Sequence, residues 1–150
     1  MLSWRLRAVT CSRISTTLDE ELLTGSGAIA APPHTPLSDL PRRSGAEVSI
    51  ELGGRLLLRY LVPAQIGAYT AGDVGQHFVT PTAYAPDEAI KWLALPAPLI
   101  PRDLVLVLEP NAIPVILGPR TVHWGGGIEY ILPNGFPQAA LHFDWEVVVS

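Results

Sequence analysis

Downstream of residue 46, apolar residues occur in short runs that Pro and Gly residues separate. Runs of this length, with turn residues between them, are typical of strands in a small antiparallel or mixed β fold. We expect Gly53 and Gly54 to turn the first run back on the second as a hairpin. The predicted strands cover residues 47–52, 55–62, 76–80, 103–109, 114–118, 127–132 and 143–149.

Residues 86–95 have the pattern of a helix instead. Pro86 suits the first helical position, where no backbone N–H is needed, and Asp87 and Glu88 complement the positive end of the helix dipole. Pro96 then ends the segment. One main helix among several strands predicts a small α+β fold that is mostly antiparallel.

The N-terminal part of the chain differs in composition from the rest. Between residues 25 and 44, Gly, Ser, Pro and Ala predominate without a period, which favours extended or disordered backbone. We therefore expect residues 1–45 to be a tail or linker and residues 46–150 to form one domain. A chain of 150 residues is long enough for one such core.

Charge and hydropathy narrow the classes of partner. Charged residues make up 16% of the chain and the formal net charge is −4, so the broad basic surface that stable nucleic-acid binding requires is missing. The longest apolar run, residues 104–117, contains Glu109 and two prolines and is shorter than the roughly 20 residues of a membrane span. We expect this domain neither to bind nucleic acid stably nor to span a membrane.

The strand at residues 55–62 places Arg59 among leucines. Its two-residue period puts Arg59 on one face with Leu57 and Leu61, and Tyr60 on the other. Arg59 either reaches water from an edge strand or is held as a bidentate donor for phosphate or carboxylate.

A second polar position follows in residues 76–82. Pro81 forces extended backbone on Thr80 and ends the strand, which leaves Thr80 and Tyr84 near the mouth of a loop. From this segment alone, ordinary hydrogen bonding at a strand end explains Thr80.

The segment GGGIEYILP sets one carboxylate, Glu129, into an apolar strand. Alternation directs Tyr130 towards the core and Glu129 to the opposite face. The preceding glycines, Gly126 and Gly127 among them, allow either a sharp turn or the close approach of a ligand to the backbone. Glu129 is accordingly either a solvent-facing acid after a glycine turn or a residue of a binding site.

Taken together, an Arg-Tyr strand, the Phe-Val-Thr-Pro-Thr segment, a helix ending in Ala-Leu-Pro and a GGGIEY strand resemble the ADP-ribosyltransferase-like C-terminal domains of bacterial polymorphic toxins. The layout is similar to the TreTu-type toxin tail, and the GGGIEY strand is also similar to the NAD glycohydrolases of the necrotizing-toxin group. The resemblance covers roughly residues 57–138. It implies a split β-sheet and NAD as the substrate.

The resemblance also implies roles for individual residues. Arg59 would bind the NAD phosphates or ribose, Thr80 would shape the nicotinamide pocket, and Glu129 would be the catalytic carboxylate. Gly126 and Gly127 would let the dinucleotide approach the backbone. The aromatic residues expected to stack on its rings are Tyr60, Phe78 and Tyr84.

One carboxylate suffices for the implied reaction, because nicotinamide leaves NAD as a neutral group and needs no general acid. Positive charge develops on the ribose as the bond breaks, and an anion aimed at that charge stabilises the transition state. Arginine-directed transferases commonly carry a second acid where this chain has Gly127, and the glycohydrolases carry Gln in place of Glu129. The acceptor of ADP-ribose therefore stays open between water, a protein and a nucleic acid.

A toxin of this kind is secreted or delivered into a target cell, acts in its cytoplasm and has a cognate immunity protein as a partner. Two other classes compete with this prediction. A cupin-like metal protein would use histidines on or near strands, although no His-x-His or His-x-x-x-His pair is present. A non-catalytic β-rich module would bind a partner through exposed tryptophans. The residues concerned are His77, His123 and His142 for the metal, and Trp124 and Trp145 for the partner.

Overall fold

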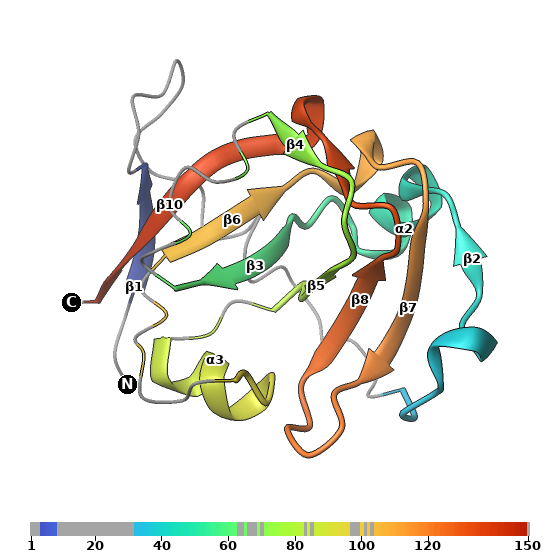
Figure 1. Cartoon of the computed structure of the whole chain (residues 1–150), viewed down its shortest axis with the longest axis horizontal. Helices are drawn as coiled ribbons and strands as arrows, with labels where there is room; N and C mark the ends of the chain where they lie inside the picture. The colour runs from blue at the N-terminus through green and yellow to red at the C-terminus, as the bar shows by residue number, and fades with distance from the viewer. Residues whose placement is uncertain are drawn as a thin grey trace.

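The computed structural model describes residues 4–8, 32–62, 65, 69, 71–82, 84, 86–96, 100, 102 and 104–149 (Figure 1). Residues 4–8, 86, 104 and 142–149 are described for their backbone alone. In this part of the chain, antiparallel strands predominate over two α-helices, which confirms the predicted α+β class.

The first sheet contains four strands in antiparallel contact. The long C-terminal strand lies inside it, between the strand nearest the N-terminus and β6 (Figure 1). The order across the sheet is β1 (Trp4–Ala8), β10 (Leu141–Val149), β6 (Leu104–Leu108) and β3 (Leu57–Leu61).

The second sheet also contains four antiparallel strands, with β7 and β8 forming its central hairpin. Its order is β2 (Arg42–Arg43), β7 (Ile116–Thr121), β8 (Ile128–Leu132) and β5 (His77–Val79). A separate two-stranded ladder pairs β4 (Gly72–Asp73) with β9 (Phe136–Pro137).

The edges of the two sheets meet at a single bridge. Leu58 of β3 and Thr80, which follows β5, exchange backbone hydrogen bonds of 2.8 and 2.9 Å. This bridge brings the Arg-Tyr strand beside the Phe-Val-Thr segment, as the sequence pattern requires if both are to serve one site.

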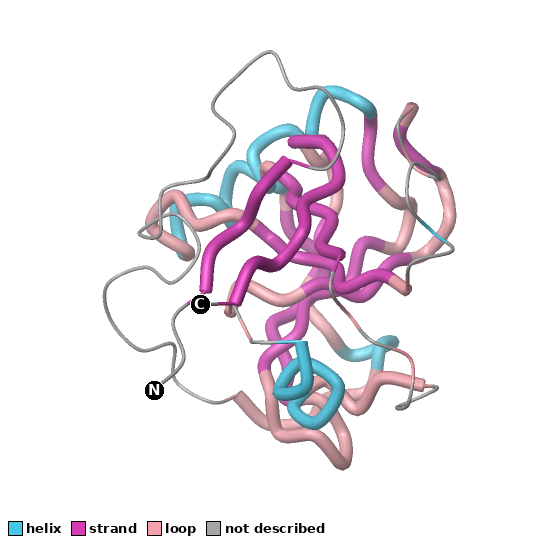
Figure 2. Tube along the Cα trace, turned by 90° about the vertical axis from the view of Figure 1, so that its left-hand side faces the viewer, coloured by secondary structure: helices cyan, strands magenta, loops and turns pink. Residues whose placement is uncertain are grey.

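Apolar side chains pack on both faces of the first sheet. On one face, Leu57 and Leu61 join side chains from the second sheet, such as Tyr130 and Leu132, in one buried cluster. On the opposite face, residues such as Leu58 pack against α3 (Pro86–Trp92). Two buried faces explain why β3 and β6 are nearly continuous apolar runs. Figure 2 shows the strands gathered in the middle of the molecule, with helical segments outside them.

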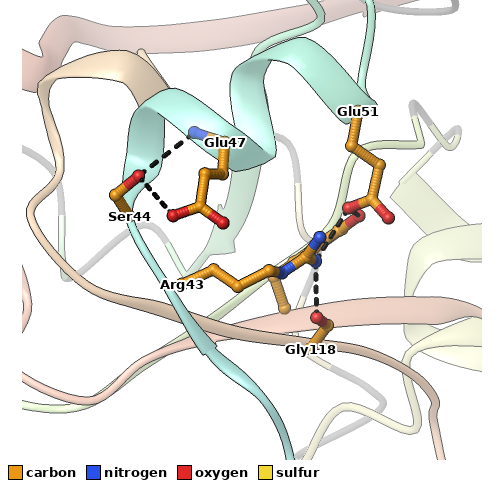
Figure 3. Close-up of polar contacts among 6 residues, drawn as sticks. Arg43, Ser44, Glu47, Glu51 and Gly118 are labelled. Carbon is orange, nitrogen blue, oxygen red and sulfur yellow. Dashed lines mark hydrogen bonds and ion pairs between the residues drawn. The ribbon is translucent and has the colours of Figure 1, made fainter.

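The predicted strand at residues 47–52 is wrong, because these residues belong to the helix α2 (Gly45–Glu51). Ser44 caps this helix by accepting the Glu47 N–H at 3.2 Å (Figure 3). Val48 and Leu52, four positions apart, are buried, whereas Ile50 between them is 82% exposed. Val48 and Leu52 therefore form the buried face of a helix, and the exposed Ile50 between them makes the sequence alternate as a strand does.

The hairpin predicted at Gly53 and Gly54 is also wrong. Both residues have positive φ, +62° and +83°, and end α2. The N–H of Gly54 donates to the Ser49 carbonyl at 3.0 Å, a bond typical of a helix C-terminus.

Part of the segment expected to be a tail is incorporated in the fold. Trp4–Ala8 pairs with β10, Arg42–Arg43 pairs with β7, and the expected boundary at residue 46 falls inside α2. Prolines and glycines favour irregular backbone locally, yet tertiary contacts with β7 order residues 32–45. The expectation for the rest of the tail lies outside the described residues.

None of the helices in the described part of the chain has both the length and the apolar character that crossing a bilayer requires.

Candidate functional site

A cavity of about 690 Å³ opens where β3, β5 and β8 lie close together. This volume is in the range that small-molecule sites occupy. The segment after α3 and the segment that leads to β6 complete its wall. Four of the predicted site residues line this cavity: Arg59, Tyr60, Phe78 and Glu129.

Arg59 supplies a cation to the cavity. Its side chain is half-buried, and its guanidinium carbon lies 6.0 Å from the centre of the Tyr69 ring. The Nε atom is buried and receives no hydrogen-bond partner from the described residues. The position of this partly buried guanidinium in the cavity lining favours the anion-binding interpretation of Arg59 over simple snorkelling.

Glu129 is buried, with an exposed fraction of 8%, and forms an ion pair that explains its place in an apolar strand. Arg120 lies opposite it in the β7–β8 register and donates from Nε to Glu129 Oε2 at 2.9 Å. The other oxygen, Oε1, accepts no hydrogen bond from the described residues. Glu129 thus presents a half-satisfied carboxylate in the wall of the cavity.

Arg120 was missed from the sequence. The predicted strand ended at Gly118, whereas β7 continues through Pro119 to Thr121. Because β7 extends this far, Arg120 pairs with Glu129, nine residues later, across the β7–β8 hairpin. An arginine at the equivalent position of an adjoining strand was the available signal, and it required a register that the sequence does not state.

The glycines before β8 contact protein rather than the cavity. The Gly127 N–H donates to the Trp92 carbonyl at 2.9 Å. A Cβ added to Gly125 or Gly127 would lie 2.2 or 2.8 Å from that same carbonyl oxygen. Gly126, with φ of +90°, lies against the Trp92 ring. The close approach that these residues permit is therefore that of the C-terminal end of α3, and neither Gly126 nor Gly127 lines the cavity.

Tyr60 and Tyr84 hold each other. The Tyr60 hydroxyl donates to the Tyr84 carbonyl at 2.5 Å and accepts the Tyr84 N–H at 2.6 Å. Burial raises the pKa of both phenols. Tyr60 therefore offers the cavity its ring alone, and Tyr84 lies outside the lining.

Thr80 is fully buried and does not line the cavity. Its Oγ1 accepts the Thr82 N–H at 3.2 Å, the strand-end bonding that the sequence already allowed. Its backbone forms the bridge to Leu58, so Thr80 joins the two strands from which Arg59 and Phe78 project.

Arg102 is a further cavity residue that sequence reasoning did not select. It is 3% exposed and donates to the Ile100 carbonyl at 2.6 Å and to the Pro96 carbonyl. Burial lowers its pKa, although a guanidinium stays charged at neutral pH. These bonds connect Arg102 to two other residues of the cavity lining, Pro96 and Ile100.

The histidines and tryptophans of the competing classes lie in separate places. His77 is buried and contacts Asp73 Oδ2 through Nε2 at 2.6 Å, whereas His123 is exposed with its ring 4.9 Å from that of His34. Within the described ranges, no three metal-ligating side chains come together. Trp124 is 91% exposed at the tip of the β7–β8 turn. The side chains of His142 and Trp145 lie outside the described residues.

Comparison with protein-family models, with curated proteins and with solved structures gives no match to this chain. The site geometry and the resemblance of the sequence motifs are therefore the two indications of function.

Proposed function

We propose that this protein binds NAD in the cavity, cleaves the bond between nicotinamide and ribose, and transfers ADP-ribose to a macromolecular target as a toxin or effector. One observation carries the proposal. Arg59 and Glu129, far apart in the sequence and on different sheets, line one cavity of suitable size.

The cavity offers a partner for each part of the substrate. Arg59 lines the cavity, and its guanidinium is suited to the diphosphate. Phe78 is 42% exposed in the lining and presents a ring on which nicotinamide or adenine stacks. The Oε1 atom of Glu129 interacts with the ribose as positive charge develops there, so the carboxylate stabilises the transition state more than the bound substrate.

The acceptor decides between transfer and hydrolysis, and the same chemistry supports an NAD glycohydrolase when water is the acceptor. A cognate immunity protein is the proposed neutralising partner in either case.

A non-catalytic binding module is a second candidate function, and Trp124 is the observation that favours it. Tryptophans are common among the residues that dominate binding energy in interfaces, and this one is almost fully exposed.

Incubation of the purified chain with NAD tests the proposal. We expect chromatography to show nicotinamide release that depends on the protein, with ADP-ribose recovered on protein, on nucleic acid or in solution according to the acceptor. Radiolabelled NAD and a lysate of target cells separate these acceptors. A chain that neither binds nor consumes millimolar NAD contradicts the proposed function.

A further inference from the structure

We propose that Arg120 is a positioning residue, which holds the Glu129 carboxylate in the orientation that the reaction requires. The inference rests on the proposed function, but concerns a residue outside the cavity lining and outside the family pattern described above. Arg120 acts through Glu129 and does not touch the substrate.

The first argument is that two nitrogens of the Arg120 guanidinium donate to different acceptors. Its Nε donates to Glu129 Oε2 at 2.9 Å, while its Nη1 donates to the Thr35 carbonyl at 3.1 Å. These two acceptors lie on different segments, so the planar group is fixed from both ends. A lysine ammonium has one nitrogen and cannot reproduce this geometry.

The second argument is the asymmetry of the carboxylate. Arg120 engages one oxygen of Glu129, and the described residues leave the other without a donor. Both side chains of the pair are only 11% exposed, so water competes weakly for the bond. Because the bond to Oε2 restrains rotation of the group, Oε1 keeps a constant direction in the wall of the cavity.

The third argument is the support behind Arg120. Residues 32–34 contact Thr121, the neighbour of Arg120 in β7. The Thr121 N–H donates to Pro33 O at 3.3 Å, its hydroxyl donates to Pro32 O, and its carbonyl lies 2.8 Å from His34 Nδ1. This segment, which the sequence marked as tail, holds the Thr35 carbonyl against Arg120.

An ion pair that served stability alone would behave differently from a positioning pair. In the first case, Arg120→Lys lowers the melting temperature, and the molecules that stay folded keep their kcat. In the second case, kcat falls in folded protein while the KM for NAD stays nearly constant, because the phosphate-binding residues are untouched.

The test compares Arg120→Lys, Arg120→Gln and the matched control Arg43→Lys in the full chain, well below each melting temperature. We expect kcat to fall on the order of 100-fold in both Arg120 variants, the effect of displacing a reacting group by about 1 Å. The KM should change less than about threefold, since ground-state binding is retained. The control should keep the native kcat, and unchanged kcat in Arg120→Lys overturns the inference.

Two further measurements act through Glu129 itself. In a Glu129→Gln background, Arg120→Gln should cause no additional loss of turnover, because the group that it positions is already gone. Ethylguanidinium added below denaturing concentrations should restore part of the kcat of Arg120→Ala, but none in the double variant. Independent, additive losses contradict the inference.

A structural measurement separates this inference from the proposed function. If the native chain releases no nicotinamide, the proposed function fails, and crystal structures of the native chain and Arg120→Gln still decide the role of Arg120. We expect the Glu129 carboxylate to leave its native position in the variant. An unmoved carboxylate overturns the positioning role whatever the substrate is.

Discussion

Two arginine–glutamate pairs meet β8 at successive residues, and they differ in what surrounds them. Glu129 pairs with Arg120, whereas Tyr130 contacts Glu51, which pairs with Arg43. Because side chains of a strand alternate, Glu129 and Tyr130 project to opposite faces of the second sheet. One strand therefore serves two polar clusters with the same chemistry.

The Arg43–Glu51 pair lies near the surface and forms its hydrogen bonds with neighbouring protein groups. Glu51 Oε2 accepts from Arg43 Nη2 at 2.8 Å and from the Tyr130 hydroxyl at 2.9 Å, and Arg43 also donates to the Gly118 carbonyl at 2.6 Å (Figure 3). Its side chains are 22% and 40% exposed, although the Arg43 Nε atom is buried and has no hydrogen-bond partner among the described residues. Such a cluster connects α2 to the second sheet and stabilises the fold.

The Arg120 pair is buried and leaves an acceptor of Glu129 unused by the described residues. Because Glu129 lines the cavity, this acceptor is available to a ligand that carries a donor. We propose that the Arg43 pair is a structural contact and that the Arg120 pair serves the site, although both join arginine with glutamate.

Replacing the two glutamates separates the pairs most strongly. Glu129→Gln keeps an acceptor for Arg120 but removes the charge, and we expect nicotinamide release to fall at least about 100-fold while the fold survives. Glu51→Gln, the matched control, should leave release unchanged. Chromatographic assays and circular dichroism measure both. Similar activity in the two variants would remove Glu129 from the mechanism.

Replacing the two arginines should separate the pairs in stability. Arg120→Met leaves Glu129 as an unpaired buried charge, and we expect the free energy of unfolding to fall by about 3 kcal/mol. Arg43→Met breaks a partly exposed pair and should lower it by about 1 kcal/mol or less. Urea denaturation followed by tryptophan fluorescence gives both values, and equal losses would contradict the distinction.

Arg59 tests the anion-binding side of the cavity. Because its Nε has no acceptor among the described residues, Arg59→Ala should leave stability nearly unchanged and raise the NAD concentration at half-maximal rate about tenfold or more. Arg42→Ala removes an exposed arginine outside the cavity and serves as the control. An unchanged NAD requirement in Arg59→Ala contradicts the phosphate assignment.

The His77–Asp73 contact extends the comparison to a third polar pair, with a smaller expected effect. Burial lowers the pKa of His77 below 6.5, and the charge of Arg59 lowers it further, whereas the hydrogen bond that Asp73 accepts from His77 raises it. Below pH 6.5 the unfolded chain therefore binds more protons than the native one, and stability declines as the pH falls.

In His77→Gln, the decrease in melting temperature between pH 7 and pH 5 should be smaller than in the native chain. His123→Gln, at an exposed position, should keep the native decrease. Differential scanning calorimetry measures both. An identical pH dependence in all three chains would show that His77 does not contribute to it.

Strand positions were predictable where burial on both faces leaves a continuous apolar run, as in β3 and β6, and where proline marks the helix start at Pro86. α2 was not, because Val48, Ile50 and Leu52 alternate as in a strand, and only tertiary packing shows that Ile50 faces water. Local patterns record periodicity but not which side the rest of the chain covers.

Only some of the site residues were likewise predictable from the sequence. Arg59 and Glu129 could be selected from sequence because each is a charged residue in an apolar strand, and Phe78 was selected through the resemblance of its motif. Arg120 could not, since its relation to Glu129 depends on hairpin register. The partner of Gly127 is the Trp92 carbonyl, a contact between distant segments that no local pattern contains.

Because Trp92 contacts the glycines before β8, the residues at these positions in another sequence indicate where its α3 lies. A methyl group at residue 125 or 127 would overlap the last turn of α3, which continues into one wall of the cavity. A chain with this motif order but with a larger residue at either position must place that helix farther out. Glycine at both positions is therefore a criterion for selecting homologues whose cavities have the same width.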